Sequence, residues 1–146
     1  MKTSQKLGLA AVVVFVISHL LPAYEDGSGF ACFQLCWSML WRPDEFSGGW
    51  AYYSGFVLVN ILMPVAVIAL FVTKRRHKLW AVVSIVCFLD VLSWAVMSAF
   101  QQPSELGKIK MGYYVWLAAY GLLVAAHLWK EPGESFESMP PVRLVT

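Results

Sequence analysis

Four polar side chains occur within long apolar stretches of this sequence: His19, Asn60, Asp90 and Tyr120. Asp90 lies in the middle of residues 79–100, a stretch with no other charged side chain. A carboxylate at the centre of a bilayer costs roughly 2.5–3.5 kcal/mol on insertion scales, so such a group usually has a partner or a function. Intramembrane acids bind cations or relay protons, and Asp90 is therefore the first candidate for chemistry.

The four polar residues are expected at similar depths in the membrane. At about 1.5 Å per residue, each lies roughly 15–18 Å from the inner end of its own apolar stretch. Pro64, four residues after Asn60, removes the hydrogen bond that the Asn60 carbonyl would accept, and it predicts a helix bend. One interpretation is a polar cluster that fixes helix packing. The other is a proton-linked or cation-binding site at Asp90.

Cys32 and Cys36 are the second candidate for chemistry. On a helix this spacing puts both thiols on one side with Cβ atoms roughly 6 Å apart, beyond usual disulfide reach. The pattern is also not the CxxC of thiol oxidoreductases. We therefore expect free thiols, with a disulfide in a non-helical loop as the alternative, and we disfavour a thiol oxidase. No nucleophile–base set or metal-ligand spacing is recognisable, so we expect no enzyme activity, metal or cofactor.

Long apolar helices must position these residues. The chain is 59% hydrophobic and 14% charged, whereas soluble domains carry roughly 25% charged residues. Four segments come near the roughly 20 residues that a spanning helix needs. Backbone groups in lipid must be paired within the segment, which favours helices. The sequence predicts an all-α, four-transmembrane-helix bundle forming one domain over residues 1–130, with helices at about 7–24, 50–72, 79–100 and 112–130.

Residues 25–49 form a long loop between the first two expected helices. Within it, residues 30–41 are apolar but too short to span, and turn-forming residues flank them. This pattern predicts an interfacial or re-entrant helix. One interpretation is that this helix covers the outer end of the bundle. The alternative is that it forms a docking surface for another membrane protein, made by Phe30, Phe33, Trp37 and Trp41.

The charge distribution predicts how the chain crosses the membrane. Residues 73–78 carry four basic side chains and no acidic one, and basic loops face the cytoplasm. Both termini are therefore expected in the cytoplasm, and residues 131–146, rich in Pro, Gly and Ser, are expected to be a flexible tail. The first apolar segment is expected to be retained, because no convincing signal-peptide cleavage site follows it. The net charge of +2 is too small to suggest a nucleic-acid partner.

Three short motifs carry a resemblance to a known group of proteins. They are Leu21-Pro22-Ala23-Tyr24, Gly48-Gly49-Trp50 with Asn60 downstream, and the Gly-Tyr-Tyr-Val-Trp-Leu-Ala run over residues 112–118. The pattern resembles small uncharacterised bacterial four-helix inner-membrane proteins, over most of residues 7–130. The resemblance implies a multi-pass protein of the bacterial inner membrane and implies no particular activity.

Two functions are therefore expected from the sequence. The first is a non-enzymatic membrane protein that acts through protein–protein contacts in the bilayer, as an accessory subunit of a complex or as an immunity-type protein that blocks a pore-forming toxin. Its partners would be the lipid bilayer and another membrane protein or a second copy of itself. The alternative is a small oligomeric carrier, coupled to protons or cations, that uses Asp90.

Overall fold

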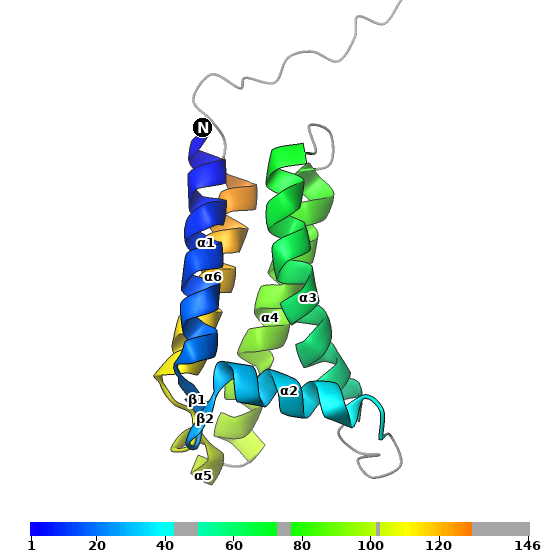
Figure 1. Ribbon diagram of the computed structural model, residues 1–146, viewed down its shortest axis with the longest axis vertical. Helices are drawn as coiled ribbons and strands as arrows, with labels where there is room; N and C mark the ends of the chain where they lie inside the picture. The colour runs from blue at the N-terminus through cyan, green and yellow to red at the C-terminus, as the bar shows by residue number, and fades with distance from the viewer. Residues whose placement is uncertain (43–49, 73–76, 102, 130–146) are drawn as a thin grey trace, which may run out of the picture.

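Four long helices make up most of the computed structural model, which describes residues 1–42, 50–72, 77–101 and 103–129. Each long helix has the length and apolar composition needed to cross a membrane. This result confirms the expected fold class of a four-helix membrane bundle with a short helix between the first two spans. In chain order the long helices are α1 (Thr3–Leu20), α3 (Trp50–Val72), α4 (His77–Gln101) and α6 (Met111–Leu128) (Figure 1).

The first helix differs from its expected bounds, since α1 ends at Leu20 rather than near residue 24. Leu21 is extended, with φ −86° and ψ 153°, because the ring of the following proline disfavours the helical region. The next residues form strand β1 (Pro22–Tyr24), which pairs antiparallel with β2 (Gly27–Ser28). The segment expected to complete the first span is therefore a hairpin at its end.

Helix α2 (Gly29–Met39) follows directly and runs across one end of the bundle, at a steep angle to the long helices (Figure 1). Its N-terminus is capped by Ser28, whose side-chain oxygen accepts a hydrogen bond from Ala31 N at 3.2 Å. Eleven residues extend only about 16 Å, which is too short to cross a bilayer. The short helix α5 (Pro103–Leu106) lies at this same end, and the N-terminus lies at the other (Figure 1).

Backbone hydrogen bonds join the two connections at the α2 end. Glu25 N donates to Lys108 O at 2.7 Å, and Lys110 N donates to Ala23 O at 3.0 Å. A bridge between Tyr24 and Ile109 extends the β1–β2 hairpin in the same way. These bonds hold the start of α6 beside the end of α1.

Helix α6 is the centre of the bundle and packs along α1 and against α4. Its side chains Tyr120 and Leu123 are fully buried, together with Met63 of α3 and Val91 of α4. Many large apolar side chains remain exposed on the outer faces of α1, α3 and α4, as expected of helices that face lipid. Helix α3 is continuous through Pro64, and the bend expected there stays a prediction.

Candidate functional site

Asp90 lies on α4 facing α3, and its side chain is exposed. A Cβ atom added to Gly55 of α3 would be 3.4 Å from Asp90 Oδ1. Within the described residues, the carboxylate has no hydrogen-bond or ion-pair partner; the Ser93 hydroxyl donates to the Asp90 backbone carbonyl, at 2.6 Å, and not to the side chain. Asp90 is the one acidic residue within the four described spanning helices, and its side chain is unpaired among the described residues.

A small cavity adjoins the Asp90 carboxylate. We call it the Asp90 cavity; it holds about 210 Å³ of empty space, including its open side. Asp90 is the only charged residue in its lining, and the other walls are mainly aromatic. Aromatic faces and a carboxylate both attract cations. The remaining lining residues are Tyr52, Phe56, Val91, Trp94 and Trp116.

The other three polar residues predicted to join Asp90 each bond to a backbone carbonyl. Tyr120 OH donates to Val59 O at 2.7 Å, and Asn60 Nδ2 donates to Phe56 O at 2.7 Å. His19 Nδ1 is 2.9 Å from Phe15 O, and because a carbonyl only accepts, this nitrogen carries the hydrogen.

No hydrogen bond in the described ranges joins any two of these four residues. Depth along a helix says nothing about the direction in which a side chain points. His19 lies near the α2 end of α1, whereas Tyr120 OH links α6 to α3. The structure therefore brings Tyr120 to the core and leaves Asp90 at the surface between α3 and α4.

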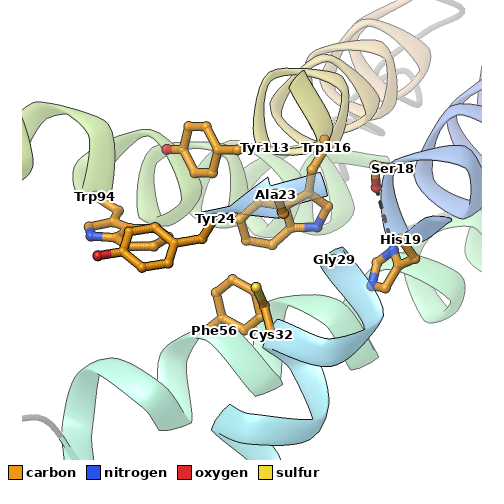
Figure 2. Close-up of a pocket in the computed structure, with 11 residues that line it drawn as sticks. Ser18, His19, Ala23, Tyr24, Gly29, Cys32, Phe56, Trp94, Tyr113 and Trp116 are labelled. Carbon is orange, nitrogen blue, oxygen red and sulfur yellow. Dashed lines mark hydrogen bonds between the residues drawn. The ribbon is translucent and has the colours of Figure 1, made fainter. Parts of the chain in front are cut away.

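A second cavity lies beneath α2, and we call it the α2 cavity (Figure 2). It holds about 330 Å³ of empty space, including its open side. Residues from α1, β1, α2, α3, α4 and α6 line it, so it exists only in the folded bundle. Its aromatic walls are Tyr24, Phe56, Trp94, Tyr113 and Trp116, of which Phe56, Trp94 and Trp116 also line the Asp90 cavity.

Two glycines let backbones approach closely around the α2 cavity. A Cβ atom at Gly29 would lie 2.7 Å from Ser18 O, and one at Gly112 would lie 2.6 Å from Pro22 O. Both distances are below normal contact, so only glycine fits without a backbone shift. Two of the motifs noted in the sequence, at residues 21–24 and 112–118, thereby meet at this cavity.

A charged cluster surrounds Tyr24 at the rim of the α2 cavity. The Tyr24 hydroxyl donates to Glu105, and Lys108 Nζ lies 2.9 Å from Glu105 and 3.3 Å from Glu25. The hydrogen bond from Tyr24 and the nearby ammonium group lower the pKa of Glu105, while the same bond raises the pKa of Tyr24. The sequence did not predict this cluster, because Tyr24 and Glu105 are 81 residues apart.

The two cysteines of the loop helix are free, as expected from their spacing. Cys36 is buried, and burial raises the pKa of its thiol to about 12; burial also raises the pKa of Cys32. Reactive cysteines have lowered pKa values, since the thiolate is the nucleophile. The expectation that the protein is not a thiol oxidase stays a prediction. Cys32 instead contributes to the lining of the α2 cavity.

The outer face of α2 is aromatic. Phe30, Trp37 and Trp41 are exposed, whereas Phe33 is half-buried. The rings of Phe33 and Trp37 are 6.2 Å apart, and those of Trp37 and Trp41 are 6.3 Å apart. Exposed tryptophans are typical of the headgroup region of a membrane, and docking of another protein here stays a prediction.

Trp116 is a polar residue of the site that the sequence did not single out. It is only 6% exposed, and its indole Nε1 has no hydrogen-bond partner among the described residues. No group of three or more His, Cys, Asp or Glu side chains in the described ranges is arranged to hold a metal ion. Comparison with protein-family models, curated proteins and solved structures found no match to this chain.

Proposed function

We propose that this integral membrane protein acts by pairing with another membrane-spanning segment through Asp90. The proposal depends on one observation: the Asp90 carboxylate is exposed between α3 and α4 and unpaired within the described residues. An isolated carboxylate at this depth is costly. A basic or hydrogen-bonding side chain on another transmembrane helix would offset that cost.

The surface around Asp90 suits such a partner. Leu89 and Val86 are exposed on α4, the helix that carries Asp90, and Leu58 and Ile61 are exposed on α3, which packs against it. An apolar surface with one polar group provides packing area together with a specific hydrogen bond, as helix association in lipid requires. An accessory subunit of a membrane complex and an immunity-type protein both act through contacts of this kind.

Affinity purification in mild detergent tests this function. A membrane protein, or a second copy of this chain, should co-purify with the wild type and with Val13→Ala, a control at an exposed apolar residue of α1. Asp90→Leu should reduce the recovered partner by about fivefold, because a polar contact between helices in lipid is worth about 1 kcal/mol. Recovery of the wild-type chain alone, without self-association, would contradict the proposal.

The second candidate function is a carrier coupled to protons or cations. The Asp90 cavity favours it, since a carboxylate beside the aromatic rings of Tyr52, Phe56 and Trp94 suits a proton or a small cation. Purified protein should then bind sodium ions saturably, release protons on binding, and lose both responses in Asp90→Asn. Binding that survives Asp90→Asn would exclude this function, and cation binding without any co-purifying protein would favour it over the first.

The location of the protein is part of the proposal. We place the chain in the bacterial inner membrane with both termini in the cytoplasm, which the basic residues 73–78 and the motifs in residues 21–24 and 112–118 support. Alkaline phosphatase fused after residue 146 should be inactive, whereas fusion at residue 107 should be active, since the enzyme folds only outside the cytoplasm. The reverse pattern would invert the assigned orientation.

A further inference from the structure

We propose that the rings of Tyr52 and Trp94 form a lid between Asp90 and the α2 end of the bundle, and that Tyr24 holds this lid closed. The lid keeps water at the α2 end away from the carboxylate, while the exposed side of Asp90 stays open to the bilayer and to a partner. The inference rests on the function proposed for Asp90, because it concerns the side from which that carboxylate can be reached.

Asp90 lies close to the α2 end of the bundle. It faces Gly55 of α3, which begins at Trp50, so Gly55 is roughly 8 Å from the first residue of that helix at about 1.5 Å per residue. Without a cover, water from this end would reach the carboxylate. Hydration lowers the cost of a carboxylate in a membrane, and it thereby weakens the need for a partner. The side chains between Asp90 and the α2 end therefore decide how strongly Asp90 favours a partner.

Two aromatic rings lie at this position. Trp94 follows Asp90 by four residues on α4, and Tyr52 precedes Gly55 by three residues on α3. Both residues are thus about one helical turn closer to the α2 end. Their ring centroids are 6.0 Å apart at an interplanar angle of 66°, and both residues line the Asp90 cavity. This edge-to-face pair joins α3 to α4 and covers the carboxylate with mainly apolar surface.

Tyr24 supports the lid from the β1–β2 hairpin. Its ring stacks on Trp94, with centroids 5.4 Å apart and an interplanar angle of 30° (Figure 2). Its hydroxyl donates to Glu105, and Lys108 Nζ lies over the same ring, 5.9 Å from the centroid. The ring is therefore held by a charge-assisted hydrogen bond and by a cation–π contact. Through Trp94, the charged cluster at the rim is connected to the wall of the Asp90 cavity.

Two carbodiimides of different solubility test the lid, because both react with carboxyl groups. The full-length protein in phosphatidylcholine vesicles is treated at one fixed pH with a water-soluble carbodiimide and glycinamide, or with dicyclohexylcarbodiimide, which enters lipid. Mass spectrometry compares the labelling of Asp90 with that of Asp26, an exposed carboxylate at the same end, so the ratio does not depend on orientation in the vesicle. In the wild type, the lipid-soluble reagent should label Asp90. The water-soluble reagent should label it at least about tenfold more slowly than Asp26.

Two variants open the lid to different extents. Trp94→Ala removes one of its rings and should raise water-soluble labelling of Asp90 by about tenfold, with labelling of Asp26 unchanged. Tyr24→Phe keeps the supporting ring but loses its hydrogen bond, so the increase should be about two- to fivefold. Phe100→Ala, at an exposed aromatic residue of α4 outside the lid, is the control and should label as the wild type does.

The outcomes separate the lid from the function proposed for Asp90. Water-soluble labelling of Asp90 at the rate of Asp26 in the wild type, or a rate unchanged in Trp94→Ala, would overturn the lid. An increase in Trp94→Ala without any in Tyr24→Phe would overturn the role of Tyr24. If Trp94→Ala does not fold, Tyr24→Phe decides, because it removes only one hydroxyl group. The proposed function fails on a different result, the absence of any co-purifying partner, which leaves the labelling rates unaffected.

Discussion

The carboxylate of Asp90 on α4 lies against Gly55 on α3, where an added Cβ atom would be 3.4 Å from Oδ1. Glycine leaves room for the carboxylate between two helices that pack together. Asp90 therefore reaches the shared surface of α3 and α4, and it is not buried in the core with Tyr120.

This relationship predicts the effect of filling position 55. Gly55→Ala should preserve every Asp90-dependent interaction, because 3.4 Å is close to an ordinary contact. Gly55→Leu should abolish co-purification of a partner, since its side chain would occupy the space beside the carboxylate. Thermal unfolding in detergent checks that both variants remain folded. An unaffected Gly55→Leu variant would mean that the Asp90 surface is not used.

Gly112→Ala should destabilise the protein by about 1–3 kcal/mol, because the added methyl group would meet the Pro22 carbonyl at 2.6 Å and force a backbone shift. Gly121→Ala, also on α6, is the matched control. Its Cβ atom would have only Phe88 Cε2 nearby, at 3.8 Å, and alanine favours helix by up to about 1 kcal/mol. Unfolding by increasing SDS measures both variants, and equal stabilities would refute the close packing of α6 on β1.

Tyr120→Phe should cost about 0.5–1.5 kcal/mol of stability, since it removes the hydrogen bond from the buried hydroxyl of α6 to Val59 O of α3. Tyr114→Phe is the control, because Tyr114 lies on the same helix with an exposed side chain. The same SDS titration measures both. A Tyr120→Phe variant as stable as the Tyr114→Phe variant would show that this bond between helices contributes nothing.

The stability of the loop end should depend on pH through Glu105. Its folded-state pKa is lowered, so the folded protein binds a proton on Glu105 less readily than the unfolded chain does. This contribution is present above the ordinary glutamate pKa of about 4.3 and is lost as the pH falls through the lowered value. The melting temperature should therefore fall as the pH is lowered from about 6 to about 3.

Three variants separate the contribution of Glu105 to the pH dependence of stability from the contributions of other acidic side chains. Glu105→Gln should make the decrease in melting temperature between about pH 6 and about pH 3 smaller, because the variant lacks the carboxylate that binds the proton. Tyr24→Phe should also reduce the fall, because the Tyr24 hydroxyl donates to the carboxylate and helps to lower its pKa. Asp26→Asn, an exposed neighbour, should behave as the wild type. Identical pH profiles for Glu105→Gln and the wild type would exclude Glu105 as a stabilising group.

Cys36 should react slowly with maleimides at neutral pH. Its pKa of about 12 leaves far less thiolate than an ordinary cysteine has at pKa about 8.5, so the rate should be lower by about a hundredfold or more. Cys32→Ser isolates Cys36 on α2, and the same reagent on the unfolded chain gives the reference rate. Alkylation of Cys36 at the reference rate would reopen the question of redox chemistry at this position.

Local rules predicted the helices because a long apolar segment in lipid has few alternatives. Residues 50–72 have the same bounds as α3, and residues 79–100 lie within α4. The loop helix was also predictable, since turn-formers flank an apolar run too short to span. The apolar stretch predicts a first helix that runs to about residue 24, but α1 ends at Leu20. Leu21 is extended because it precedes a proline, and hydropathy does not detect this local effect.

The candidate sites were less predictable. Depth along each span suggested that His19, Asn60, Asp90 and Tyr120 share a level, but rotation about each helix axis decides which of them meet. Tyr120 bonds to α3, and Asp90 turns to the surface beside Gly55. The α2 cavity was not visible in the sequence at all, since its walls come from six elements spread over residues 18–116.

By itself, the sequence determined four apolar spans, a short helix between the first two, and one acidic residue inside a span. These features follow from composition and length, because lipid requires each segment to pair its own backbone. Only the tertiary structure decided that Asp90 is unpaired among the described residues and that the Trp116 indole N–H opens onto a cavity beneath α2. The reason is geometric, because contacts between helices depend on how each helix is rotated and on how closely the helices approach. The sequence shows glycines at positions 55 and 112, but only the folded structure shows which atoms lie against them.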